Sequence, residues 1–174
     1  KNVSVFEKKI SKLFQKKYGL MVNSGSSALL LAMETLDFPE GSEIITPALT
    51  FSTTVGYIVR NKWIPVFVDV EEGTYCINEN KIKNLITKKT KAIMLVHVLG
   101  NCTNMDELMK IKKKNNLFLI EDTCESLGTK FKKKYLGTFG EFASFSFYSS
   151  HQISSGEGGM ICCSNADDHE ILKS

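Results

Sequence analysis

Several features that would mark a particular class of protein are rare or missing in this chain. Its 174 residues include three prolines, one tryptophan and a single arginine, Arg60. The longest apolar runs, at 28–33 and 92–98, are too short to cross a bilayer, so we expect no membrane partner. Lysine lacks the planar fork with which arginine reads bases, and the net charge is only +3. We therefore expect no nucleic-acid partner either.

Cysteine spacing excludes further classes. No two of the five cysteines stand in a CxxC pattern, so no metal site is complete within the chain, and their odd number argues against a disulfide framework. Residues 1–18 are lysine-rich and amphipathic and lack the apolar stretch of a secretory signal. These features predict a cytoplasmic protein. Cys162 and Cys163 fall on a predicted strand, where we expect them to be buried apolar residues.

The composition is that of a folded domain. Hydrophobic residues make up 43% of the chain and charged residues 24%, which excludes a disordered protein. Short β-rich runs alternate with helical patterns, and most runs are continuously apolar, as in strands covered on both faces. The predicted strands are 20–22, 43–46, 65–70, 92–98, 117–122, 143–148 and 160–163, and the predicted helices are 5–18, 26–36, 53–61, 80–86 and 105–115. This order predicts an α/β fold with a doubly wound, mainly parallel sheet.

Both ends of the sequence look interrupted. The helical pattern at 5–18 starts close to the first residue, and the pattern at 166–174 stops in mid-helix without a capping residue. We therefore expect the sequence to be a fragment of a longer chain.

Ligands of open α/β sheets gather at the carboxyl ends of the strands, and three such places carry unusual residues. The first is Asn-Ser-Gly-Ser-Ser-Ala at 23–28, a small polar turn that leads into a helix. Free N–H groups and hydroxyls at a helix start suit a phosphate, although a capped helix without a ligand is the plainer explanation.

The second place is Glu121-Asp122, at the end of an apolar strand. An acid there can hold a protonated ring nitrogen, bind a metal or cap the next loop. The third place is 144–159, where a β run ends in a polar stretch that contains His151 and then clustered glycines. Such glycines mark positive φ angles or close backbone approaches. A lone histidine is more often structural than catalytic, and the glycines favour function only modestly.

Together these segments resemble the DegT-type sugar aminotransferase family, whose members use pyridoxal phosphate on the fold-type I scaffold. The matching stretches keep the family's order and spacing: NSGSSA at 23–28, PALTF at 47–51, PVFVDV at 65–70, TKAI at 90–93, Glu121-Asp122, GTFG at 137–140, residues 146–148 and GEGG at 156–159. The resemblance implies that residues 1–174 form part of a three-layer α/β/α large, cofactor-binding domain, with the small C-terminal domain absent. It also implies a homodimer.

The family's motifs assign cofactor roles to particular residues of this sequence. Gly25 and Ser26 would bind the cofactor phosphate, and the hydroxyl of Ser146 would join them. Phe51 would stack on the pyridine ring, as a flat apolar side chain can. Asp122 would pair with the ring N–H, which keeps the ring cationic and able to accept electrons.

One departure from the family pattern indicates a sub-class. The aminotransferases carry a lysine a few residues before GEGG, and its amine bonds covalently to the cofactor. This chain has His151 there, and no lysine between Lys134 and Lys173. A histidine at this place resembles the family's nucleotide-sugar 3-dehydratases, which bind pyridoxamine phosphate non-covalently. Residues 99–101 and 122–125 also match that sub-class, and Glu125 is counted among the cofactor-binding residues.

The resemblance implies a reaction as well. These dehydratases remove the C3 hydroxyl of a 4-keto-6-deoxy sugar linked to CDP or GDP, in deoxysugar and lipopolysaccharide O-antigen biosynthesis. An imidazole titrates near neutral pH. His151 would therefore act as the general base, and it is a candidate to protonate the leaving hydroxyl.

Two sub-types of dehydratase fit the sequence. One receives electrons through an iron–sulfur cluster and a partner reductase, and the other regenerates its amine with glutamate. Cys124 stands where the cluster type has its first thiolate ligand, but glutamate-using relatives carry a cysteine there too. The remaining cluster ligands would lie beyond Ser174.

Two other functions stay open at this point. One is an ordinary pyridoxal-phosphate-dependent nucleotide-sugar aminotransferase, and the other is an inactive relative that only binds the cofactor or a sugar nucleotide. The retention of Asp122 and Ser146 favours catalysis, because an inactive relative is expected to lose them.

Overall fold

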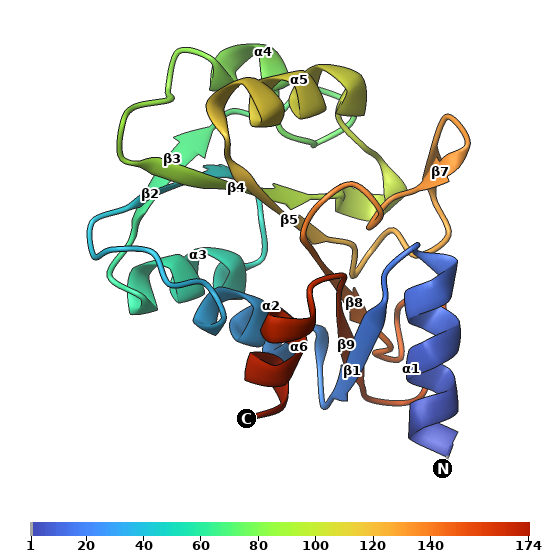
Figure 1. The fold of residues 1–174 in the computed structure, drawn as a ribbon. Coiled ribbons are helices and arrows are strands. Elements are labelled where there is room, and N and C mark those ends of the chain that lie inside the picture. The colour runs from blue at the N-terminus through green and yellow to red at the C-terminus, as the bar shows by residue number, and fades with distance from the viewer. Residues whose placement is uncertain (1) are drawn as a thin grey trace.

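Seven strands form one sheet in the computed structural model, which describes residues 2–174 (Figure 1). Their order across the sheet is β1-β9-β8-β5-β4-β2-β3. The strands are β1 (Tyr18–Val22), β2 (Glu43–Pro47), β3 (Ile64–Val68), β4 (Thr90–Val96), β5 (Phe118–Asp122), β8 (Phe142–Ser146) and β9 (Gly159–Cys163). Neighbours from β8 to β3 are parallel, and β9 is antiparallel to both of its neighbours. The mainly parallel sheet predicted from the sequence is confirmed.

Helices cover both faces of this sheet, which gives three layers, α/β/α. Buried side chains place α2, α3 and α6 on one face and α1, α4 and α5 on the other. The helices are α1 (Asn2–Leu13), α2 (Gly25–Glu34), α3 (Ser52–Arg60), α4 (Glu79–Ile82), α5 (Met105–Asn115) and α6 (Ala166–Lys173). A 3-10 turn, η1 (Val98–Gly100), and a hairpin of β6 (Lys130–Phe131) and β7 (Lys134–Tyr135) were not predicted. Within residues 2–174, no helix combines the length and apolar character that a membrane span requires.

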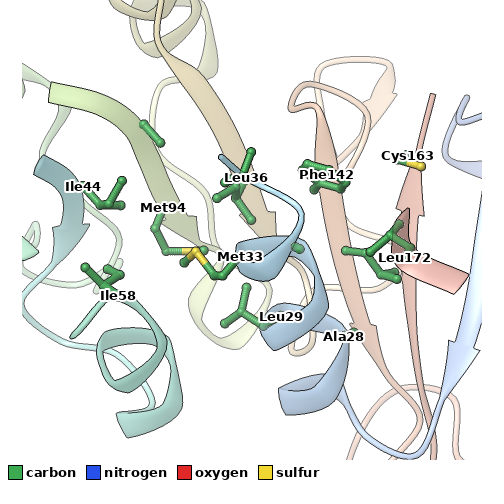
Figure 2. Close-up of a cluster of buried hydrophobic side chains, with 14 of the residues drawn as sticks. Ala28, Leu29, Met33, Leu36, Ile44, Ile58, Met94, Phe142, Cys163 and Leu172 are labelled. Atoms are coloured by element: carbon green, nitrogen blue, oxygen red, sulfur yellow. The ribbon is translucent and has the colours of Figure 1, made fainter. Parts of the chain in front are cut away.

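One hydrophobic core lies between the sheet and the helices on the α2 face (Figure 2). Leu29 and Met33 of α2 pack there with Met94 of β4. The prediction that Cys162 and Cys163 are buried in a strand is confirmed, and burial raises the pKa of these thiols to about 12 and about 11. Because helices cover the central strands on both sides, those strands are continuously apolar in sequence.

The first helix is shorter than its sequence pattern predicts. The pattern runs to residue 18, whereas α1 ends at Leu13 and β1 begins at Tyr18. Gln15 adopts a left-handed conformation with φ 56°, and the N–H of Lys16 donates to the carbonyl of Ser11 over 2.8 Å. This arrangement is a Schellman stop. The prediction overran it because the lysine-rich periodicity continues beyond the last helical turn.

Several strands end before their apolar runs do. β3, β4 and β8 each stop two residues short of the predicted boundary, at Val68, Val96 and Ser146. After β4, His97 departs from strand geometry (φ −96°, ψ 81°) and leads into η1. The apolar residues that follow β4 therefore belong to a loop, and hydrophobicity alone does not reveal where the strand ends.

A buried carboxylate ties the carboxyl end of β5 to two neighbouring segments. Glu121 is fully buried, and its Oε1 accepts hydrogen bonds from the N–H groups of Phe139 (2.7 Å) and Gly140 (2.6 Å). Its Oε2 accepts from the N–H of Gly137 (2.8 Å) and from Nε2 of His97 (3.2 Å). Burial alone would raise the pKa of the Glu121 carboxyl, but the hydrogen bonds from His97, Gly140 and Gly137 outweigh burial and hold that pKa below its ordinary value.

We expect Glu121→Gln to lower the free energy of unfolding of the intact protein by about 3 kcal/mol at pH 7. The NH2 group of the glutamine would face backbone N–H groups that now donate to the carboxylate, so donors would face donors. Since the folded-state pKa is depressed, the charge of Glu121 stabilises the fold fully above the ordinary value of 4.5. This contribution disappears as the pH falls through the lowered pKa. Denaturant unfolding at several pH values should therefore show the two proteins converging in acid.

The matched control is Glu72→Gln, the same change at an exposed position, for which we expect a change below about 0.5 kcal/mol. Equal stability of wild-type and Glu121→Gln protein at pH 7 would show that this carboxylate does not hold the segment at 137–140.

Candidate active site

A cleft of about 780 Å³ opens at the carboxyl ends of the parallel strands. Its lining residues lie at the ends of β1, β2, β4, β5 and β8 and in the segments that follow them. Every site residue predicted from the sequence lines this cleft: Gly25, Ser26, Phe51, Asp122, Cys124, Glu125, Ser146 and His151. The fold thus brings together residues that are up to 126 positions apart in the chain, from residue 25 to residue 151.

One corner of the cleft is formed by the start of α2 and the end of β8. The side chain of Ser24 caps α2 by accepting from the N–H of Ser27 over 3.1 Å, while the N–H of Ser26 has no partner among the described residues. A methyl group on Gly25 would lie 2.9 Å from Cβ of Ser146 and 2.5 Å from Sγ of Cys124. Only glycine allows the helix start to come this close to β8. The N–H groups and hydroxyls gathered there suit an anion such as a phosphate.

Asp122 ends β5 with a nearly buried carboxylate that is 9% exposed. Its Oδ1 accepts from the N–H of Cys124 (3.1 Å) and the hydroxyl of Ser144 (3.3 Å). Oδ2 accepts no hydrogen bond from the described residues. The side chain is therefore held in one orientation with a free oxygen, which is what a carboxylate needs to pair with a ring N–H.

Cys124 lies against this corner with a partly buried thiol. Burial, with the neighbouring Asp122 charge as a second cause, raises the pKa of Cys124 well above its ordinary value. In residues 2–174 no group of three or more histidine, cysteine or acidic side chains could hold a metal ion. The predicted iron–sulfur role of Cys124 thus finds no support in this part of the chain, where the thiol fills space beside Gly25 and Ser144.

Phe51 and His151 stand on different loops of the cleft, after β2 and after β8. Phe51 precedes α3, lines the cleft and is 68% exposed, so its ring is accessible to a bound molecule. His151 is partly buried, its N–H donates to the carbonyl of Tyr148 (3.0 Å), and the Tyr148 ring meets the imidazole edge to face at 6.1 Å.

Glu125 lines the cleft, but its carboxylate already has a partner. Oε2 accepts from the N–H of Leu99 over 2.8 Å. Leu99 is 71% exposed and adopts a left-handed conformation, with φ 51°. The predicted cofactor-binding residue therefore also fixes the loop after β4.

Sequence reasoning missed His97 as a residue of this region. It lines the cleft, its side chain is fully buried, and its Nδ1 lacks a hydrogen-bond partner in residues 2–174. A signal was present in the sequence, since His97 is the one titratable residue in the apolar run at 92–98, next to the end of a strand.

The fold is that of an aminotransferase-like α/β protein. The solved structure of an E. coli GDP-4-keto-6-deoxy-D-mannose-3-dehydratase with bound hydrated PLP has a TM-score of 0.95 and 38% sequence identity to this chain. The match covers 99% of this chain and 46% of that one.

A family profile gives the more specific assignment. Residues 1–174 match the DegT/DnrJ/EryC1/StrS aminotransferase family. The chain belongs to this family, and the resemblance that the sequence motifs indicate is confirmed.

Relatives within the family differ in activity. A dTDP-4-dehydro-2,6-dideoxy-D-glucose 3-dehydratase of Saccharopolyspora spinosa is 41% identical over 99% of this chain and 39% of its own length. A GDP-perosamine synthase of Escherichia coli O157:H7 is 40% identical over 91% of this chain and 44% of its own length. This chain thus spans less than half the length of these relatives. Identity alone does not separate a dehydratase from a perosamine synthase.

The close approach at Gly25 generates a prediction. We expect Gly25→Ala to weaken pyridoxamine phosphate binding by the intact protein at least about tenfold, because the added methyl group must displace Cys124 and Ser146. We expect it also to lower the free energy of unfolding by about 1–3 kcal/mol. Isothermal titration and denaturant unfolding measure the two effects.

The matched control is Gly56→Ala in α3, where an added methyl group meets nothing within 4 Å. We expect unchanged cofactor affinity and a stability equal to wild type or up to about 1 kcal/mol higher. Normal cofactor affinity in Gly25→Ala would mean that this corner is not a phosphate site.

Proposed function

We propose that the intact protein containing these residues is a pyridoxamine-phosphate-dependent 3-dehydratase of a 4-keto-6-deoxy nucleotide sugar linked to CDP or GDP. The observation that carries the proposal is His151 in the cleft, at the place in the motif where the family's aminotransferases have a lysine. No lysine is among the residues that line the cleft. A site without a primary amine favours a cofactor that binds non-covalently and brings its own amine.

The residues present fit such a cofactor. The corner at Gly25 offers N–H groups and hydroxyls for a phosphate, and Asp122 offers a carboxylate oxygen without a protein partner. The cleft, at about 780 Å³, is of the size that small-molecule sites have. When bound, the cofactor would supply an amine that condenses with the sugar ketone and a ring that accepts electrons.

Each residue would then perform a separate task. Gly25, Ser26 and Ser146 bind the phosphate, and the exposed aromatic side chain of Phe51 covers the ring face. Asp122 keeps the proton on the ring nitrogen, because a nearly buried carboxylate favours its cationic partner.

His151 would move the protons of the reaction. Its imidazole accepts a proton at a ring nitrogen and returns one to the C3 oxygen as that group leaves. A lysine at this position would instead return a proton to carbon and keep the hydroxyl, which is the outcome of amino transfer. The identity of residue 151 thus selects between the two reactions.

We also propose that the protein acts as a homodimer in the cytoplasm.

A nucleotide-sugar aminotransferase is the second candidate. The 40% identity to a GDP-perosamine synthase favours it. It requires a cofactor that exchanges amine groups without a covalent lysine anchor, so its support is weaker than that of the dehydratase.

We expect His151→Asn to abolish dehydration, with a loss of more than about a hundredfold, while the affinity for pyridoxamine phosphate stays within about twofold of wild type. The amide has nearly the size of the imidazole but does not exchange a proton near neutral pH. Turnover of a 4-keto-6-deoxy nucleotide sugar and equilibrium cofactor binding are the measurements.

His169→Asn is the matched control, because His169 lies on α6 against Tyr18 and does not line the cleft. We expect turnover close to wild type in this variant. Wild-type turnover in His151→Asn as well would remove His151 from the mechanism.

A second substitution tests whether residue 151 faces the cofactor. We expect His151→Lys, incubated with pyridoxal phosphate and then borohydride, to retain the cofactor covalently on Lys at that position after denaturation, whereas wild-type protein releases it. Peptide mass analysis locates the attachment. Labelling of other lysines only would place residue 151 away from the cofactor.

A further inference from the structure

The loop that carries His151 makes few hydrogen bonds to the rest of the fold among the described residues. It runs from the end of β8 to the start of β9, and most of its residues at 148–157 are exposed. Most of its hydrogen bonds stay within the loop or reach Ser146 and Phe147, at and just after the end of β8. Among the described residues, one hydrogen bond leads from 148–157 to a different segment. The donor is the side-chain amide of Gln152.

That amide donates to a well-anchored partner. Nε2 of Gln152 lies 2.6 Å from the backbone carbonyl oxygen of Glu125, a short and direct contact. The carboxylate of Glu125 in turn accepts from the N–H of Leu99 over 2.8 Å. The loops after β4, β5 and β8 are thereby joined in series through Glu125, on the side of the cleft where His151 lies.

The segment of Glu125 is itself fixed to the sheet. The N–H of Cys124 donates to the Asp122 carboxylate, and both the N–H and the hydroxyl of Thr123 donate to the carbonyl of Ser144 in β8. Gln152 therefore connects an exposed loop, of the kind that is usually mobile, to the rigid segment that carries Glu125.

We propose that Gln152 is a positioning residue of this site: its hydrogen bond to the Glu125 carbonyl holds the imidazole of the preceding residue over the cleft. Proton transfer requires that the base lie within hydrogen-bond distance of the proton it takes. Displacing a reacting group by about 1 Å can lower the rate about a hundredfold. The inference rests on the proposed role of His151. It adds a residue that touches neither cofactor nor substrate and acts through its neighbour.

Two variants of the intact protein separate the hydrogen bond from the shape of the side chain. Gln152→Glu keeps the shape but has no donor at neutral pH and turns a negative charge toward a carbonyl oxygen. Gln152→Lys keeps a donor that can reach the same oxygen. Ser149→Ala, an exposed position of the same loop that does not line the cleft, is the control for any change in the loop.

The kinetic measurement is the turnover of a 4-keto-6-deoxy nucleotide sugar with pyridoxamine phosphate. We expect Gln152→Glu to lower kcat about 10- to 100-fold, with KM and cofactor affinity changed less than about twofold. We expect Gln152→Lys and Ser149→Ala to stay within about threefold of wild type. Wild-type kcat in Gln152→Glu would overturn the proposal, as would an equal loss in Gln152→Lys.

A second measurement needs neither cofactor nor turnover. The ring signals of His151 can be assigned by NMR from their loss in the His151→Asn variant of the intact protein. In the protein without cofactor, we expect Gln152→Glu to shift or broaden the His151 signals and Gln152→Lys to leave them in place. Unmoved signals in Gln152→Glu would overturn the proposal. If His151→Asn proved fully active, the proposed function would fail, but the NMR result would still decide whether Gln152 holds the loop.

Discussion

The structure of the cleft depends on the buried carboxylate of Glu121. This carboxylate lies on β5, the central strand of the sheet, where a buried ion without partners would be strongly unfavourable. It accepts hydrogen bonds from the N–H groups of Gly137, Phe139 and Gly140 and from the imidazole of His97. These bonds fix the ends of β4 and β5 against the segment that leads into β8. Asp122 is the next residue along β5, so its position at the edge of the sheet is set by the same interactions. Side chains alternate along a strand, and Glu121 therefore faces the α5 side while Asp122 faces the α2 side.

The residues proposed for cofactor binding and for proton transfer lie on different parts of the fold. Rigid parts of the fold carry the residues proposed to bind the cofactor phosphate and ring nitrogen: the start of α2, the end of β5 and the end of β8. The residue proposed to move protons lies on an exposed loop after β8, which is tied back by one side chain. Binding and proton transfer thus depend on different parts of the structure, and substitutions should affect them separately.

Much of the fold could be predicted from the sequence, because continuous apolar runs such as 92–96 are typical of strands covered on both sides. The meeting of Gly25, Asp122 and His151 in one cleft could be predicted too, since motif order and the carboxyl ends of parallel strands place them together. The end of α1 could not, because the lysine pattern continues past the left-handed Gln15. Nor could the partner of Glu125, since a hydrogen bond to the N–H of Leu99 depends on how two loops meet in space.

We propose that a protein whose cleft carries an imidazole in place of a lysine removes an oxygen from the sugar and does not add nitrogen to it. The most direct test is NMR analysis of the product that the intact protein forms from a CDP- or GDP-linked 4-keto-6-deoxy sugar, with pyridoxamine phosphate and glutamate present. We expect a keto sugar that lacks the C3 oxygen. A 4-amino sugar that retains its C3 hydroxyl would contradict it.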